Sequence, residues 1–148
     1  MPVLKSRKPF PLFLLVTLML AALPACSAAD NASELHMLSM DQLPAEVQAA
    51  PVTVRSAYQF AAANPDVMQQ LPCYCGCGGI GHESNYDCYV ADVEPTGAIR
   101  FDGHALGCSI CVDITQDAMR MLKEGKPVPE IRAWVDATYS SYGPSNMQ

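Results

Sequence analysis

Three cysteines at alternate positions occupy one short, glycine-rich segment of this chain, Pro72-Cys73-Tyr74-Cys75-Gly76-Cys77-Gly78-Gly79. Three more cysteines follow, so residues 73–111 hold six of the seven in the protein. Packing alone seldom needs sulfur at this density. The segment therefore indicates thiol chemistry, and the chemistry depends on whether the sulfurs hold a metal, form disulfides or carry electrons.

The spacing of these cysteines favours a site for a soft metal ion. Residues i and i+2 of an extended segment project to the same side, about 7 Å apart, and Gly76 and Gly78 allow a tighter fold. Cys108 and Cys111 form a C-x-x-C pair at an expected helix start, where the helix N-terminus stabilises a thiolate. Clustered thiolates select Cu(I) or Zn(II) over hard cations.

Eight residues are the predicted metal ligands, six thiolates and two imidazoles close to them in sequence: Cys73, Cys75, Cys77, Cys88, Cys108, Cys111, His82 and His104. Copper is favoured by the C-x-C-x-C run and by the soft side chains of His36, Met37 and Met40 upstream. Zinc is the alternative, favoured by the C-x-x-C pair and by the structural need of a small domain.

Two other uses of the cysteines remain open. Three disulfides are arithmetically possible, and they are common in oxidising compartments, although a bridge within C-x-C would close a strained ring. A thiol–disulfide redox protein that uses Cys108 and Cys111 is the third hypothesis, but the βαβ surroundings of a thioredoxin-type site are missing. We find no pattern of hydrolase or phosphotransferase chemistry and expect a binding protein, not an enzyme.

The N-terminus predicts export and a lipid anchor. Lys5, Arg7 and Lys8 precede an apolar run from Phe10 to Leu23, which is too short for a typical membrane span and fits a signal peptide. The run ends in Leu23-Pro24-Ala25-Cys26, which resembles a bacterial lipobox and makes Cys26 the expected site of acylation. The alternative is ordinary cleavage near Ala25 or Ala29, with Cys26 left as a free thiol.

We therefore expect four regions: a lipoprotein signal peptide (1–25), a flexible tether from lipidated Cys26 (26–50), one cysteine-rich domain (51–143) and a tail (144–148). Without residues 1–25 the chain keeps six basic residues against fifteen acidic ones, a formal net charge of −9. This charge argues against a nucleic-acid partner. The expected partners are membrane lipid, through acylated Cys26, and an envelope protein that exchanges metal.

The expected fold is mainly α: a small helical domain with a cysteine-rich loop region and a short β-hairpin, stabilised by a bound metal or by disulfides. Apolar spacing predicts a helix from Pro51, with Val54, Ala57, Tyr58 and Ala61 on one face, and a short helix from Pro65 to Leu71. Residues 88–93 and 98–101 flank a turn and predict the hairpin. Two helices then follow, one from about Ile110 to Gly125 and one from about Pro127 to Gly143. The second is expected to bury Ile131, Trp134, Val135, Thr138 and Tyr142.

Over residues 55–142 the chain resembles the bacterial PCYCGC-motif lipoproteins. The resemblance rests on Pro72–Cys77, Gly81-His82, Ser84–Cys88, Cys108–Cys111 and the stretch from Glu124 to Tyr139. It implies a lipoprotein of the bacterial envelope and implies no mechanism. The residues themselves predict an extracytoplasmic, membrane-anchored protein that binds soft metal for sequestration or delivery.

Overall fold

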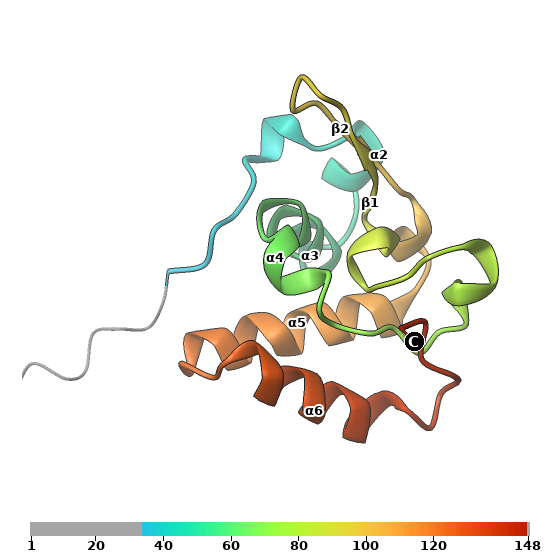
Figure 1. Cartoon of the computed structure of the whole chain (residues 1–148). Coiled ribbons are helices and arrows are strands. Elements are labelled where there is room, and N and C mark those ends of the chain that lie inside the picture. The colour runs from blue at the N-terminus through green and yellow to red at the C-terminus, as the bar shows by residue number, and fades with distance from the viewer. Residues whose placement is uncertain (1–33, 148) are drawn as a thin grey trace, which may run out of the picture. The chain divides into compact units, whose positions relative to one another are not determined.

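The computed structural model describes residues 34–147, and these residues form a mainly α-helical unit (Figure 1). The expected signal peptide, Cys26 and the first part of the expected tether lie outside the described residues. The prediction of a small helical fold with a hairpin and a cysteine-rich loop region is confirmed.

The segment before residue 51 packs on the helical unit from about Leu35 onward. It contains the 3-10 turn η1 (Met40–Gln42) and the short helix α2 (Ala45–Gln48). Leu43 and Val47 are buried in the core, and the amide of Leu38 donates to the carbonyl of Gln59 at 2.9 Å. This part of the expected tether is therefore structured, because its sparse apolar side chains fit against α3.

Helix α3 (Val52–Ala63) follows Pro51, as predicted, and buries Ala57, Tyr58, Phe60 and Ala61. It ends at Asn64, whose side-chain amide donates to the carbonyls of Phe60 and His36. Helix α4 (Pro65–Met68) is shorter than expected. The chain leaves it with Leu71 and Pro72 buried and then enters the cysteine segment.

The predicted hairpin is present, as β1 (Val90–Val93) paired antiparallel with β2 (Ile99–Phe101). Gly97 adopts φ 85° in the connecting turn, a conformation that favours glycine. Cys88 lies before the strand, in the 3-10 turn η3 (Tyr86–Cys88), and is buried. A second turn, η4 (His104–Leu106), joins the hairpin to the next helix.

Helix α5 (Ser109–Lys123) and helix α6 (Val128–Tyr139) form the predicted pair, and Gly125 turns the chain between them with φ 77°. On α6, Ile131, Val135 and Tyr139 are buried and Trp134 is half-buried. The prediction that Thr138 and Tyr142 are buried was wrong, because the buried stripe advances by four residues from Ile131 and reaches Tyr139.

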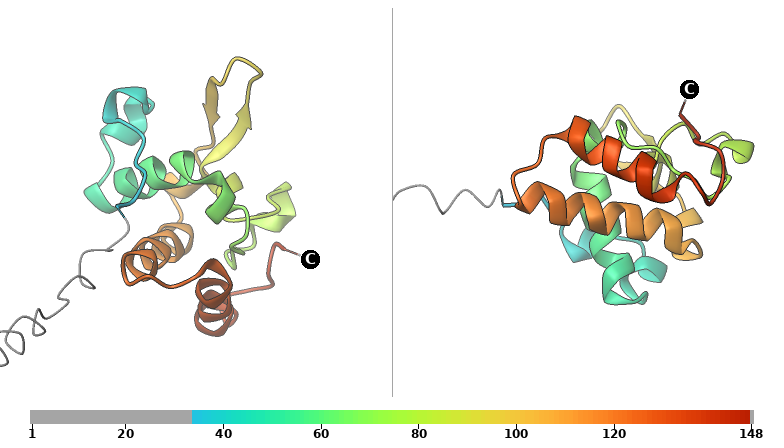
Figure 2. Two further views of the ribbon diagram at one scale, coloured as in Figure 1. Left: turned by 60° about the vertical axis from the view of Figure 1, so that its left-hand side comes forward. Right: turned by 90° about the horizontal axis from the view of Figure 1, so that it is seen from below.

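Helix α5 is central to this arrangement. Helix α6 packs along one side of it and α3 runs across another (Figure 2). The loop of residues 69–89, turn η4 and the C-terminal tail gather at the N-terminal end of α5 (Figure 1). The fold thus brings segments that are far apart in sequence to one end of a single helix.

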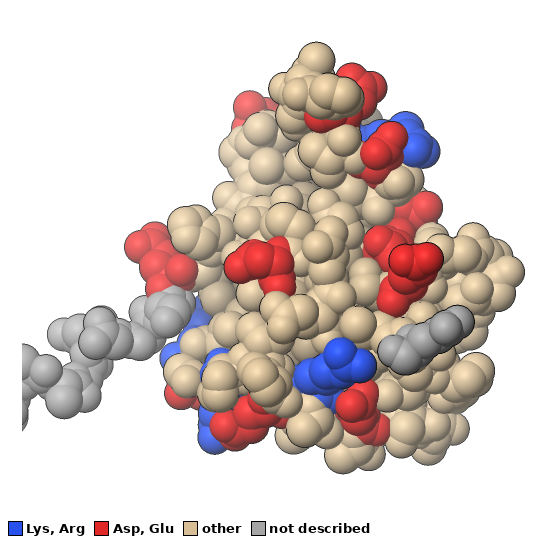
Figure 3. Space-filling view, viewed as in Figure 1, with Lys and Arg blue, Asp and Glu red and all other residues tan. Residues whose placement is uncertain are grey.

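Acidic side chains are distributed across the face of the molecule that Figure 3 shows. The chain carries fifteen acidic and nine basic residues overall. A surface of this sign attracts cations and repels phosphate backbones.

Candidate metal centre

The cysteine segment is held in place by a hydrogen bond within the loop and by the C-terminal tail. The amide of Asn85 donates to the carbonyl of Leu71 at 2.8 Å. Asn146 makes two hydrogen bonds to Cys73. The backbone amide of Cys73 donates to Oδ1 of Asn146 at 2.6 Å, and the backbone amide of Asn146 donates to the carbonyl of Cys73 at 3.1 Å. Gly76 adopts φ 87° and turns the chain between Cys75 and Cys77. The three cysteines consequently point inward from a loop that is fixed at both sides.

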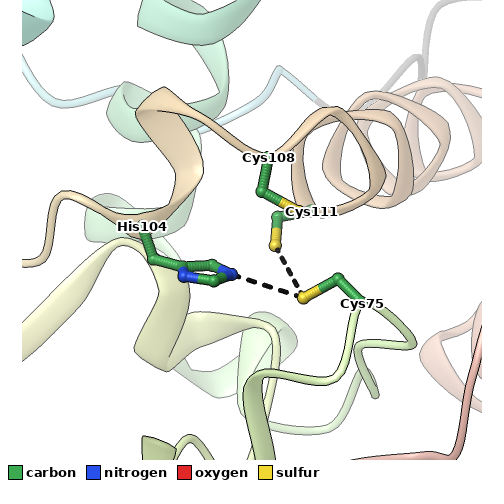
Figure 4. A group of neighbouring side chains, drawn as sticks. All are labelled: Cys75, His104, Cys108 and Cys111. Carbon is green, nitrogen blue, oxygen red and sulfur yellow. Dashed lines mark hydrogen bonds between the residues drawn. The ribbon is translucent and has the colours of Figure 1, made fainter.

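Four of the predicted ligands come together at the N-terminus of α5 (Figure 4). We call them the histidine-containing group: Cys75, His104, Cys108 and Cys111, whose ligand atoms all lie within 4.8 Å of one another. Sγ of Cys75 is 3.4 Å from Nε2 of His104 and 3.7 Å from Sγ of Cys111. Cys111 is fully buried, whereas Cys75, His104 and Cys108 are half-buried.

These distances match tetrahedral coordination of a soft metal. With metal–sulfur and metal–nitrogen bonds of about 2.3 and 2.0 Å, two sulfurs at tetrahedral corners lie about 3.8 Å apart, and a sulfur and a nitrogen about 3.5 Å apart. The observed separations are 3.7 Å and 3.4 Å. Two separations within the histidine-containing group thus match those of a metal site, and all of its ligand atoms lie within 4.8 Å of one another, so the group could hold a metal ion.

Three further thiols form an all-cysteine group: Cys73, Cys77 and Cys88. All three are buried, and Sγ of Cys77 and Sγ of Cys88 are 3.7 Å apart. The side-chain amide of Asn146 donates to Sγ of Cys77 at 3.5 Å. Three buried sulfurs with an amide donor beside them suit a soft ion with few ligands.

The two groups touch through Cys73. Its Sγ lies 3.3 Å from Sγ of Cys75 and 3.4 Å from Sγ of Cys111, both members of the histidine-containing group. Sulfur atoms from the two groups are thus in direct contact, and no side chain separates them.

The thiols of Cys73, Cys75 and Cys111 differ in pKa. Hydrogen bonds from the thiol of Cys111, and then of Cys88, hold the pKa of Cys73 far below its usual range. The same hydrogen bond to Cys73 raises the pKa of Cys111, and burial raises that of Cys75. One thiolate is thereby favoured among protonated neighbours. A soft cation that replaces these protons allows several thiolates to lie together.

A buried polar network fixes the backbone of Cys111. Its carbonyl accepts hydrogen bonds from the hydroxyl of Tyr89 at 2.8 Å, the hydroxyl of Thr115 at 3.0 Å and the amide of Asn85 at 3.3 Å. The side-chain amide of Asn85 also reaches Thr115 at 3.0 Å. All three side chains are inaccessible to solvent. Such partners orient metal ligands and are as much a part of a metal site as the ligands themselves.

Our reading of the sequence did not identify Asn85, Tyr89, Thr115 or Asn146 as parts of the site. Asn85 had a signal, because it lies in the Ser84–Cys88 run that carries the family resemblance. Thr115 had another, as a polar residue one turn after Cys111 on a helix with a buried face. Asn146 had none, since only the fold brings the tail to Cys73.

His82, the eighth predicted ligand, belongs to neither group. Its Nε2 lies 3.7 Å from Oδ2 of Asp102, and its ring packs edge-on against His104 with centroids 5.2 Å apart. Nδ1 of His82 is buried and has no hydrogen-bond partner in the described part of the chain. His82 therefore packs against the candidate ligand His104 and is not itself in a ligand group. It also lines a cavity of about 370 Å³, together with Asp87 and Asp102.

Three further sequence predictions concern the side chains upstream of the domain, the disulfides and the acylation site. His36 is exposed and belongs to neither group, while Met37 and Met40 are also exposed. Among residues 34–147, all six cysteines are free thiols. The acylation site, Cys26, lies outside the described residues.

A family model described as "protein of unknown function with PCYCGC motif" matches residues 16–146. The match spans most of the chain, and the chain therefore belongs to this family. No curated protein and no solved structure was found to match it. Within residues 34–147, no helix has the length and hydrophobicity needed to cross a membrane.

Proposed function

We propose that this protein is a non-enzymatic binding protein for Cu(I). The observation that carries the proposal is the histidine-containing group, in which three sulfurs and one imidazole nitrogen are spaced as the ligands of one soft ion. Thiolate and imidazole are soft or borderline donors, and hard cations such as Mg²⁺ and Ca²⁺ prefer oxygen.

The number of thiols favours copper. A zinc ion uses four ligands, whereas six thiols are gathered here, three of them in an all-cysteine group that is buried from solvent. Cu(I) is stable with few, soft ligands, and burial protects it from oxidation. We assign the protein to copper sequestration, or to delivery of copper to another protein of the cell envelope.

Zinc is the second candidate, and one observation favours it. Three cysteines and one histidine are a common ligand set of structural zinc sites, and the group lies where the loop, turn η4 and α5 meet. In that case the ion would serve mainly to stabilise the fold of a small domain.

The location is also proposed. The apolar run before Cys26 supports export, and acylation of Cys26 would anchor the chain at the outer face of a bacterial membrane. Cys26→Ser should release the protein from the membrane fraction without changing its metal content. Release together with loss of metal would contradict this separation of anchor and site.

The proposed function is tested by competition for Cu(I) between the anaerobic protein and a chromophoric chelator. Cys75→Ser removes the sulfur that contacts both His104 and Cys111, and should weaken Cu(I) binding by about 100-fold or more, since loss of even a supporting residue costs about 10–100-fold. Ser109→Ala is the matched control, because Ser109 is exposed between Cys108 and Cys111. Equal affinity in wild type and Cys75→Ser would overturn the site.

A further inference from the structure

We propose that the two cysteine groups form one centre that holds two Cu(I) ions, bridged by the thiolate of Cys73. The inference rests on the proposed function and goes beyond it, because it assigns the number of ions and the residue they share.

The seven ligand atoms do not suit a single ion. Ligands of one ion lie at most about 4.6 Å apart, twice a metal–sulfur bond. Seven candidate ligands are more than one soft ion takes, and among residues 34–147 they form two groups, each with its own ligand atoms within 4.8 Å of one another. Two centres of coordination are therefore expected, one in each group.

The two centres must share a sulfur. Cys73 belongs to the all-cysteine group, yet its Sγ is nearer to Cys75 and Cys111 than those two are to each other, at 3.3 and 3.4 Å against 3.7 Å. A thiolate sulfur has several lone pairs and can bind two metal ions at once. The position of Cys73 between the groups makes its sulfur the natural bridge.

Charge favours the second ion. Binding forms Cu–S bonds and releases thiol protons to solvent, with no change of oxidation state. One Cu(I) offsets one thiolate charge, and the remaining buried thiols would have to stay protonated. A second ion in the all-cysteine group offsets a second charge, and the side-chain amide of Asn146 donates to Sγ of Cys77 at 3.5 Å.

The test is to load the full-length protein anaerobically with Cu(I), count the bound ions by native mass spectrometry, and search for Cu···Cu scattering by X-ray absorption. We expect two ions per chain and a Cu···Cu distance below about 4.6 Å, the limit for a shared sulfur. In Cys88→Ser the chain should keep one ion. In Cys73→Ser the Cu···Cu signal should disappear.

The outcomes separate this inference from the proposed function. A single ion in the wild type, or two ions without Cu···Cu scattering, would overturn the bridged centre and leave copper binding intact. No bound ion would overturn the proposed function itself. The wild-type measurement decides the question even where a buried Cys→Ser variant fails to fold.

Discussion

Cys73 differs from its neighbours because hydrogen bonds from surrounding thiols stabilise it as a thiolate. The pKa of Cys75 is raised by burial and that of Cys111 by its hydrogen bond to Cys73, so metal binding at these two thiols displaces protons. The pKa of each of these cysteines therefore depends on its contacts with neighbouring sulfurs.

His104 is the one nitrogen donor in the two candidate ligand groups of residues 34–147. His104→Ala should weaken binding at the histidine-containing group by more than about 100-fold, because a ligand is lost and not only its support. Competition titration with Cu(I) or Zn(II) measures the change. His36→Ala is the matched control, since His36 is exposed and lies in neither group. Equal losses in the two variants would contradict the assignment of His104.

Tyr89 tests the buried network behind Cys111. Tyr89→Phe removes the hydroxyl that donates to the Cys111 carbonyl and should reduce the free energy of unfolding by about 1–3 kcal/mol. It should also weaken metal binding by about 10–100-fold. Tyr142→Phe is the control, because Tyr142 is 64% exposed. Full stability together with unchanged affinity would show that the network has no supporting role.

At the scale of elements, the loop of residues 69–89 contains only short 3-10 turns, and other elements fix its shape. Cys108 occupies the N-cap position of α5, and Cys111 lies in the first turn of the helix. The C-terminal tail returns to the same place through Asn146. The centre depends on three segments that are separated in sequence.

Gly143 is where the tail passes the cysteine loop. A Cβ at Gly143 would lie 2.8 Å from the carbonyl oxygen of Tyr74, which is too close for any side chain. Gly143→Ala should therefore displace the tail, disturb the pairing of Asn146 with Cys73 and cost about 1–3 kcal/mol of stability, measured by urea unfolding.

The control for this variant is Gly107→Ala. An added Cβ at Gly107 meets no atom within 4 Å, and its φ of −109° suits alanine. A loss of stability at Gly107 as large as that at Gly143 would mean that the tail contact is not the cause.

Elements with a local signal could be predicted from the sequence. Helices α3, α5 and α6 follow from apolar spacing with Pro51 and Gly125 at their ends, and the hairpin from its turn. The packing of residues 35–48 on α3 could not be predicted, because that segment is mostly polar. Its few apolar side chains show no periodic pattern, and they become buried only when the segment contacts the rest of the fold. The limits of α4 and the buried face of α6 near Tyr139 were also set by tertiary packing.

The candidate ligands could likewise be chosen from the sequence, but their grouping could not. Sequence proximity suggested both His82 and His104 as ligands, whereas the fold brings His104 to Cys75 and leaves His82 beside Asp102. The division of six cysteines into two groups depends on contacts between residues 73–77 and α5, and no local pattern encodes those contacts.

At the scale of the whole molecule, buried tyrosines make stability depend on alkaline pH. Burial raises the pKa of Tyr58, beside the charge of Asp102, and burial with the hydrogen bond to Asp136 raises the pKa of Tyr74 to about 12. In the unfolded chain a tyrosine titrates near pH 10. The stability that these groups provide is therefore complete below about pH 10 and is lost as the pH rises toward the folded pKa.

We expect the tyrosine contribution to the free energy of unfolding to fall above about pH 10, by up to about 1.4 kcal/mol per pH unit for each tyrosine. Urea unfolding of the metal-free protein between pH 8 and 11 measures the slope. Tyr58→Phe should be less stable at pH 8, since it loses the hydrogen bond to the Asp102 carbonyl, and should show a shallower alkaline loss. An unchanged slope in this variant would contradict the role of Tyr58.

The measurement that tests the central claim most directly is metal content together with a count of free thiols in protein purified anaerobically without added metal. We expect at least one copper or zinc ion per chain, with the six thiols of residues 73–111 recovered under denaturation after chelation. Absence of metal together with absence of free thiols would contradict the account. Contacts such as that between Cys77 and Cys88 would then be disulfides in the purified protein, and the cysteine segment would serve to stabilise the fold.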